Sequence, residues 1–132
     1  MQRDIINPWK WQDRYGFVQA NRASGADRVL FCAGQGAADE DGNIVHSGDI
    51  SAQTAQCLDN LETVLKESGF TLADVVRLNY YTTDVQAFFD RASPVLAERF
   101  AASGCRPAST LLGVAQLALP GMVIEIEATA VA

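Results

Sequence analysis

The sequence has few residues of the kinds that build metal centres or disulfide frameworks. His46 is the only histidine, and the three cysteines (Cys32, Cys57 and Cys105) are odd in number and far apart. Zinc sites need several cysteine or histidine ligands at short spacings, and small secreted domains pair their cysteines. We therefore expect no metal, no disulfide and a reducing, cytoplasmic location for the chain.

Positive charge and long apolar runs are scarce as well. The chain has 10 Lys and Arg against 16 Asp and Glu, which gives a formal net charge of −6 at pH 7. Nucleic acids and anionic membranes attract basic surfaces. No stretch approaches the roughly 18 consecutive apolar residues of a membrane-spanning helix, and no apolar run follows a basic N-terminal segment. We expect neither nucleic acid nor membrane as a partner, and no secretion signal.

The rest of the composition is that of an ordinary globular protein. Apolar residues make up 48% of the 132 residues and charged residues 20%, and no repeat or linker divides them. A chain of this length can bury a core without disulfides or metals. We expect a single domain over residues 1–132.

The N-terminal quarter is predicted to be an arm followed by a hairpin. Residues 6–17 are rich in aromatic and charged side chains and contain a proline, which indicates an irregular, packed segment. Turn-forming residues lie between the apolar runs 17–20 and 29–33. This punctuation predicts that the two runs pair as antiparallel strands.

Hydrophobic periodicity predicts two helices and several strands in the remainder. Apolar residues recur every three or four positions over 51–68 and 85–103, and Pro94 indicates a kink or a late start in the second helix. β-branched and aromatic residues predict strands at 73–84, 109–118 and 122–132. The order β-β-α-β-α-β-β predicts an α+β domain, a mixed sheet with two helices on one face. The other face carries apolar residues among its glutamates, so we expect a partner subunit to cover part of it.

Glu125 and Glu127 are the first candidates for chemistry. Residues i and i+2 of a strand share a face, so both carboxylates point the same way. A carboxyl on a partly buried face holds its proton more tightly and can act as a general acid or base. The pattern is equally typical of a solvated sheet face, and spacing alone favours that second interpretation.

Arg106, Ser109 and Thr110 form a second candidate group, in "RPAST". Arg106 can grip a carboxylate bidentately, and the two hydroxyls can donate hydrogen bonds. An exposed arginine before a proline explains Arg106 equally well. In a regular strand an odd separation puts Arg106 and Ser109 on opposite faces, although Pro107 can break that regularity.

Two further features have weaker interpretations. Gly34 and Gly36 follow a strand, where glycine lets a ligand approach the backbone, but the third glycine and the helix of a dinucleotide site are missing. Cys105 is the only thiol beside a cation, Arg106, that lowers a thiol pKa. A turn and inert buried thiols are the alternative interpretations.

The sequence resembles the Rid (YjgF) family of enamine and imine deaminases. The resemblance covers the chain from about residue 17 to its end and rests on "GFVQA", "FCAGQ", "AQTAQCLDNLETVL", "RPAS" and "GMVIEIEATAVA". It implies a chorismate-mutase-like fold of the bacillus type and a homotrimer whose sheets face inward as a barrel, with three clefts between subunits. It also implies hydrolysis of small reactive substrates such as 2-aminoacrylate to a keto acid and ammonia, without a cofactor.

The resemblance assigns roles to individual positions. Glu125 corresponds to the glutamate thought to position water, and Gly34 to a glycine whose backbone contacts the ligand. The family's other site residues are changed: the carboxylate-clamp arginine is Ser109, a cysteine is Leu111, a tyrosine is Phe17 and an asparagine is Ala92.

The missing arginine implies a divergent member with another substrate. A neutral serine cannot replace a guanidinium that pairs with a carboxylate. Arg106, Arg14 and Arg22 are the candidate substitutes, and Ser109 and Thr110 remain expected substrate contacts. A non-catalytic ligand-binding or regulatory trimer is the alternative function, and a redox role for Cys105 is a third.

Overall fold

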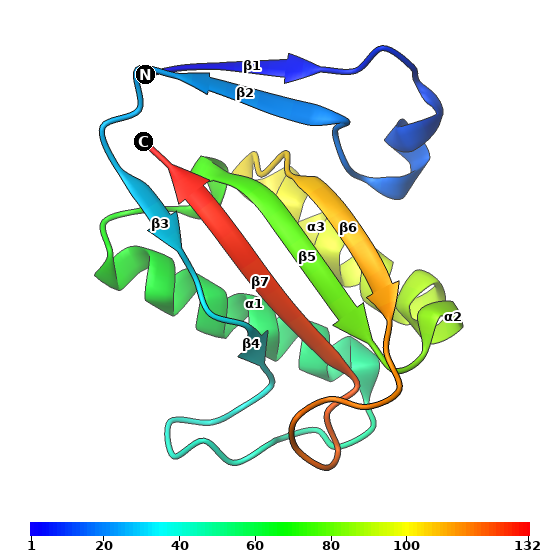
Figure 1. Cartoon of the computed structure of the whole chain (residues 1–132). Coiled ribbons are helices and arrows are strands. Elements are labelled where there is room, and N and C mark those ends of the chain that lie inside the picture. The colour runs from blue at the N-terminus through cyan, green and yellow to red at the C-terminus, as the bar shows by residue number, and fades with distance from the viewer.

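A computed structural model describes all 132 residues as a mixed sheet with helices packed on one face (Figure 1). The strands are β1 (Gln2–Ile6), β2 (Ala20–Ser24), β3 (Val29–Phe31), β4 (Gln35–Gly36), β5 (Val75–Thr82), β6 (Ala108–Gly113) and β7 (Ile124–Val131). The helical segments are η1 (Trp11–Tyr15), α1 (Ile50–Glu67), η2 (Leu72–Asp74), α2 (Val85–Ala87), the π-helical turn η3 (Phe88–Ala92) and α3 (Ser93–Ser103). None of the helices is long and apolar enough to cross a membrane.

The main sheet has the strand order β3-β7-β5-β6, with β4 also paired to β7. β5 and β6 run parallel, and the other pairs are antiparallel. Ile124 and Ile126 of β7 and Leu78 of β5 alternate into the core, where α1 and α3 cover them. The prediction of an α+β domain with two helices on one face of a mixed sheet is confirmed.

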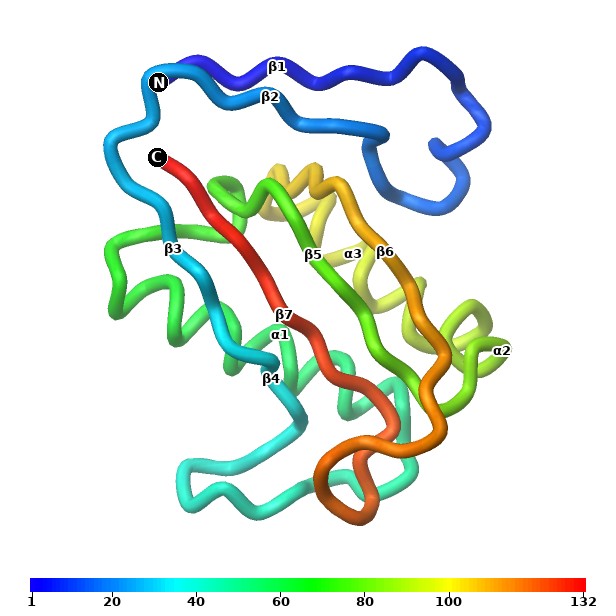
Figure 2. Tube along the Cα trace, viewed as in Figure 1, coloured from blue at the N-terminus to red at the C-terminus, as the bar shows by residue number.

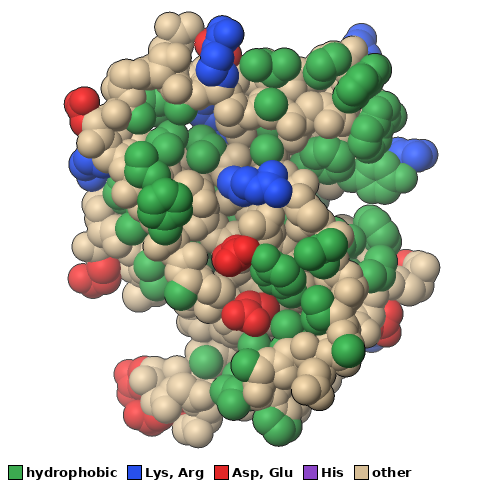
Figure 3. Space-filling view, viewed as in Figure 1, with side chains coloured by type: hydrophobic (Ala, Val, Ile, Leu, Met, Phe, Trp, Pro, Cys, Tyr) green, Lys and Arg blue, Asp and Glu red, His purple; other side chains and the backbone are tan.

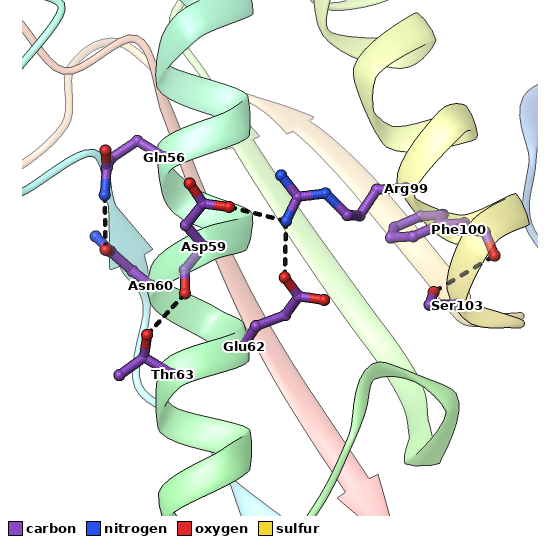
Figure 4. A network of polar contacts seen from close by, with 8 residues as sticks. All are labelled: Gln56, Asp59, Asn60, Glu62, Thr63, Arg99, Phe100 and Ser103. Carbon is purple, nitrogen blue, oxygen red and sulfur yellow. Dashed lines mark hydrogen bonds and ion pairs between the residues drawn. The ribbon is translucent and has the colours of Figure 1, made fainter.

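The two long helices are tied to the sheet and to each other. Asp49 caps α1, its carboxylate accepting a hydrogen bond from the backbone N–H of Ala52, and Leu58, Leu61 and Leu65 of the helix are fully buried. Arg99 of α3 bridges to Asp59 (2.9 Å) and Glu62 (2.8 Å) of α1 (Figure 4). Pro94 lies in the first turn of α3, directly after η3, and the helical conformation already begins at Val85, so the second helix does not start late.

The predicted hairpin between residues 17–20 and 29–33 is wrong. β2 pairs with β1, not with β3, and these two strands form a separate ribbon beyond the end of the main sheet (Figure 2). Gly25 lies at a bend, with φ of 69°, and this bend leads from one sheet to the other. Residues 2–6, for which the sequence predicted no strand, pair with the whole length of β2.

Arg3 anchors this ribbon to the sheet. Its guanidinium donates to the carbonyls of Ala73 (2.7 Å), Val75 (3.2 Å) and Arg106 (2.7 Å), and its Nε donates to Asn21 Oδ1 (3.0 Å). Asn21 in turn donates to the same Arg106 carbonyl at 3.0 Å. The start of β6, which holds one candidate site, is therefore positioned by the N-terminal ribbon.

Replacing Arg3 with methionine is expected to lower the free energy of unfolding by about 2 kcal/mol, since hydrogen bonds to a charged donor are lost while the carbonyls stay partly buried. Urea unfolding of the purified variant measures this. Arg22→Met is the matched control, because Arg22 is exposed and pairs only with Asp4 at 2.8 Å. Equal effects of the two substitutions would contradict an anchoring role for Arg3.

Candidate functional site

A pocket of about 970 Å³ opens between the N-terminal arm, the helical layer and β6. Figure 3 shows a notch at this edge of the molecule, with hydrophobic side chains on both of its sides. Its polar lining consists of Asp13, Arg14, Ser93, Arg106 and Ser109, and its apolar and aromatic lining includes Tyr15, Phe17, Tyr80, Phe88, Phe89, Leu96, Phe100 and Leu111.

β6 places two of the predicted site residues in this pocket. Ser109 pairs with Leu78 and Leu111 with Tyr80 in the parallel β5–β6 register, so both face the helical side of the sheet. Arg106 precedes β6 and also lines the pocket, as does Phe17 at the end of the arm. Four predicted residues from two segments of the sequence, 106–111 and the arm, are thus brought together.

Two other predicted contacts lie outside the pocket. Thr110 faces the open side of the sheet, where its Oγ1 accepts a hydrogen bond from Arg77 Nη2 at 2.7 Å. Ala92 ends the π-helical turn η3 and is fully buried in the core. In this protomer neither side chain shares the cavity of Ser109.

Gly34 and Glu125 form a second cluster, on the open face of the sheet. A Cβ atom built on Gly34 would overlap Glu125 Oε1, so the carboxylate occupies the space that the missing side chain leaves free. Gly36 of β4 pairs with Glu125 of β7 and holds this segment in register. Neither Gly34 nor Glu125 lines the pocket beside β6.

Glu127 has partners that the sequence did not reveal. Asn79 Nδ2 donates to its Oε1 at 2.9 Å, and the Tyr81 hydroxyl donates to the same oxygen at 2.5 Å. These two hydrogen bonds hold the pKa of Glu127 below its ordinary value, and the bond from Tyr81 has the larger effect. The prediction that partial burial on this face raises the pKa of the carboxyl group is therefore wrong for Glu127. Arg77, Asn79 and Tyr81 alternate along β5, and that period of two was the signal that could have found them.

Tyr81→Phe is expected to raise the pKa of Glu127 toward its ordinary value of 4.5. Because the folded-state pKa is depressed, the contact stabilises the protein above the unfolded-state pKa, and this contribution is lost as pH falls through the folded-state pKa. A side-chain carboxyl NMR titration measures the shift. An identical Glu127 titration in both proteins would show that the hydroxyl does not stabilise the ionised form.

The cysteines do not form a reactive centre. All three are free thiols, and burial raises the pKa of both Cys57 and Cys105 to about 12. The prediction that Arg106 lowers the Cys105 pKa is wrong, because desolvation outweighs the opposing influence of the nearby cation, which is Arg3. The structure holds no group of three or more His, Cys, Asp or Glu residues that could bind a metal ion.

The structure distinguishes the three arginines that were predicted as substitutes for the missing carboxylate-binding arginine. Arg14 and Arg106 line the pocket, and neither guanidinium makes an ion pair. Arg22 lies on the β1–β2 ribbon, where it pairs with Asp4, and is absent from the pocket lining. Two cations of the three therefore remain available to a ligand beside Ser109.

This fold and these two clusters define a small α+β protein with two helices on one face of a mixed sheet. The sequence model described as Endoribonuclease L-PSP matches residues 13–132. A RutC family protein of Pyrococcus horikoshii is 36% identical over 110 residues, 83% of this chain and 84% of its own. A Rid-family protein of unknown function from Yersinia pestis is 37% identical over 100% of both chains, with a TM-score of 0.89. A YjgF-family structure from Mycobacterium tuberculosis is 30% identical, covers 99% of this chain and 100% of its own, and has a TM-score of 0.66.

The chain belongs to the Rid family, whose sequence model carries the Endoribonuclease L-PSP description.

Proposed function

We propose that the protein hydrolyses the C=N bond of an imine, or of the imine tautomer of an enamine, in a cleft between subunits of a homotrimer. The observation that supports this most is the contact between Gly34 and Glu125. A carboxylate held against a glycine, with no hydrogen-bond donor on its oxygens from any side chain, is free to bind a water molecule.

The proposed reaction needs only this carboxylate, water and a bound substrate. Water adds to the imine carbon while Glu125 accepts a proton from it and returns a proton to the imine nitrogen. The carbinolamine then loses ammonia as its C–N bond breaks, and its hydroxyl proton leaves with the nitrogen. The products are a carbonyl compound and ammonia, so one water molecule is consumed and no cofactor is needed.

The proposed site requires a second copy of the chain. Glu125 lies on the open face of the sheet, whereas Ser109 faces the pocket on the helical side, so one protomer does not join them. Phe31 of the same open face is 79% exposed, and Val29 and Leu112 are also exposed. Burying these side chains against a neighbour supports the proposed trimer, and a heterologous interface repeated three times closes into a ring.

The alternative is a trimer that binds its ligand without converting it. Ser109 favours this alternative, because the residue expected to hold a substrate carboxylate is neutral. RNA cleavage, which the family description names, fits poorly with a formal net charge of −6.

The experiment is a turnover assay on a panel of imines generated in situ by an amino-acid oxidase. Ammonia release faster than the spontaneous rate on at least one imine, and its loss in Glu125→Gln, would support hydrolysis. Thermal stabilisation by a substrate-like carboxylate without any acceleration would support the binding protein instead.

A further inference from the structure

The pocket beside Ser109 is lined by two arginines. Arg14 and Arg106 both line it, one from η1 and the other from the segment before β6, and Asp13 is the only acidic residue of the lining. The lining therefore has a formal charge of +1 in a chain whose net charge is −6. Arg14 is also held in place, since its guanidinium carbon lies 4.8 Å from the centre of the Tyr15 ring.

The remainder of the pocket is walled by a chain of aromatic rings. Tyr15 and Phe89 both line the pocket and contact each other at a tilt of 58°, with ring centroids 6.1 Å apart, which joins the N-terminal arm to the helical layer. The ring centroids of Phe89 and Phe88 are 5.9 Å apart, and those of Phe88 and Tyr80 are 5.3 Å apart. Tyr15 and Phe89 remain 47% and 44% exposed. Exposed rings around a cavity are typical of ligand binding.

The π-helical turn is what brings Phe89 to this position. The extra residue of η3 lets two successive rings serve different roles: Phe88 is buried against the sheet, and Phe89 turns to Tyr15. A pocket of about 970 Å³ is also far larger than a three-carbon imino acid requires.

We propose that Arg14 and Arg106 together replace the missing strand arginine, and that the substrate is a carboxylate carrying an aromatic ring. The carboxylate pairs with these guanidiniums in the pocket, and the aromatic ring packs against Tyr15, Phe17 and Phe89. This inference rests on the proposed function for the reaction, but the binding it describes can be measured without any turnover.

The test measures binding of stable 2-oxo acid products by titration calorimetry. Phenylpyruvate carries both features, pyruvate lacks the ring, and phenylacetone lacks the carboxylate. We expect phenylpyruvate to bind at least about tenfold more tightly than either, and the Arg14→Gln/Arg106→Gln variant to lose about tenfold or more of that affinity. Phe89→Ala should narrow the preference for phenylpyruvate over pyruvate while leaving pyruvate affinity unchanged.

The control is Arg22→Gln, which removes one positive charge outside the pocket. Equal affinity of the double variant and the control would overturn the clamp, and equal affinity for phenylpyruvate and pyruvate would overturn the aromatic preference. Arginine-dependent binding with no hydrolysis of any imine would retain this inference and refute the proposed reaction. If the double variant hydrolysed an imine with unchanged kcat and KM, the proposed reaction would stand and the two-arginine clamp would be refuted.

Discussion

Glu125→Gln is expected to lower kcat by a factor of about 10² to 10⁴, the usual contribution of a general acid–base group. Glutamine has nearly the same shape, so it can still sit against Gly34, but it cannot accept a proton from water. KM should change little, because the substrate carboxylate and ring are held elsewhere. Initial rates of ammonia release at saturating and limiting substrate separate the two parameters.

Glu127→Gln is the matched control for this experiment. It lies two residues away on the same strand and face, and its oxygen already accepts hydrogen bonds from Asn79 and Tyr81. A glutamine oxygen can still accept both, so turnover should stay near that of the unchanged protein. If the two substitutions reduced kcat equally, the loss of activity would result from removing a negative charge on this face of the sheet, and not from a specific role of Glu125.

Gly34→Ala is expected to reduce kcat by roughly 100-fold, since a displacement of a catalytic group by about 1 Å has effects of this size. The new Cβ would occupy the space of Glu125 Oε1, so the carboxylate must move. Gly34 has no positive φ, so the backbone itself tolerates alanine. We therefore expect the melting temperature to change little while activity falls.

Gly36→Ala provides the comparison at the neighbouring glycine. Its added Cβ would meet the terminal methyl of Met122 at 2.6 Å, and that flexible side chain can rotate away. Activity near the original level is expected. Retained activity in Gly34→Ala, or a loss of the same size in Gly36→Ala, would argue against a role for Gly34 in placing Glu125.

The helical and strand periods were enough to predict the central architecture. The three-to-four-residue repeat in 51–68 corresponds to α1, and the alternation over 122–132 corresponds to β7 with its two glutamates on the open face. These patterns are strong because one face of each element is buried over many residues. The ribbon of β1 and β2 gave no such signal, since most of its residues are only partly buried or exposed.

The site was predictable only in part, for a physical reason. The sequence grouped Ser109 with Thr110 as substrate contacts, but the period of two along β6 puts Ser109 at the pocket and Thr110 on the open face of the sheet. The roles of Arg14 and Phe89 depend on how the arm and the π-helical turn fold over the pocket, which are contacts between segments more than 70 residues apart in the chain. No local pattern encodes such a contact.

Subunit complementation tests the central claim, that Glu125 of one protomer works on a substrate held in the pocket of the next. Glu125→Gln lacks the carboxylate, and Ser109→Trp fills the pocket from β6, so each variant alone should be inactive while remaining a folded trimer. Unfolding the two together and refolding them as an equal mixture should restore about a quarter of the original activity, because one in four heterologous interfaces then joins two intact halves. Activity that stays at the level of the separate variants would contradict a site shared between subunits.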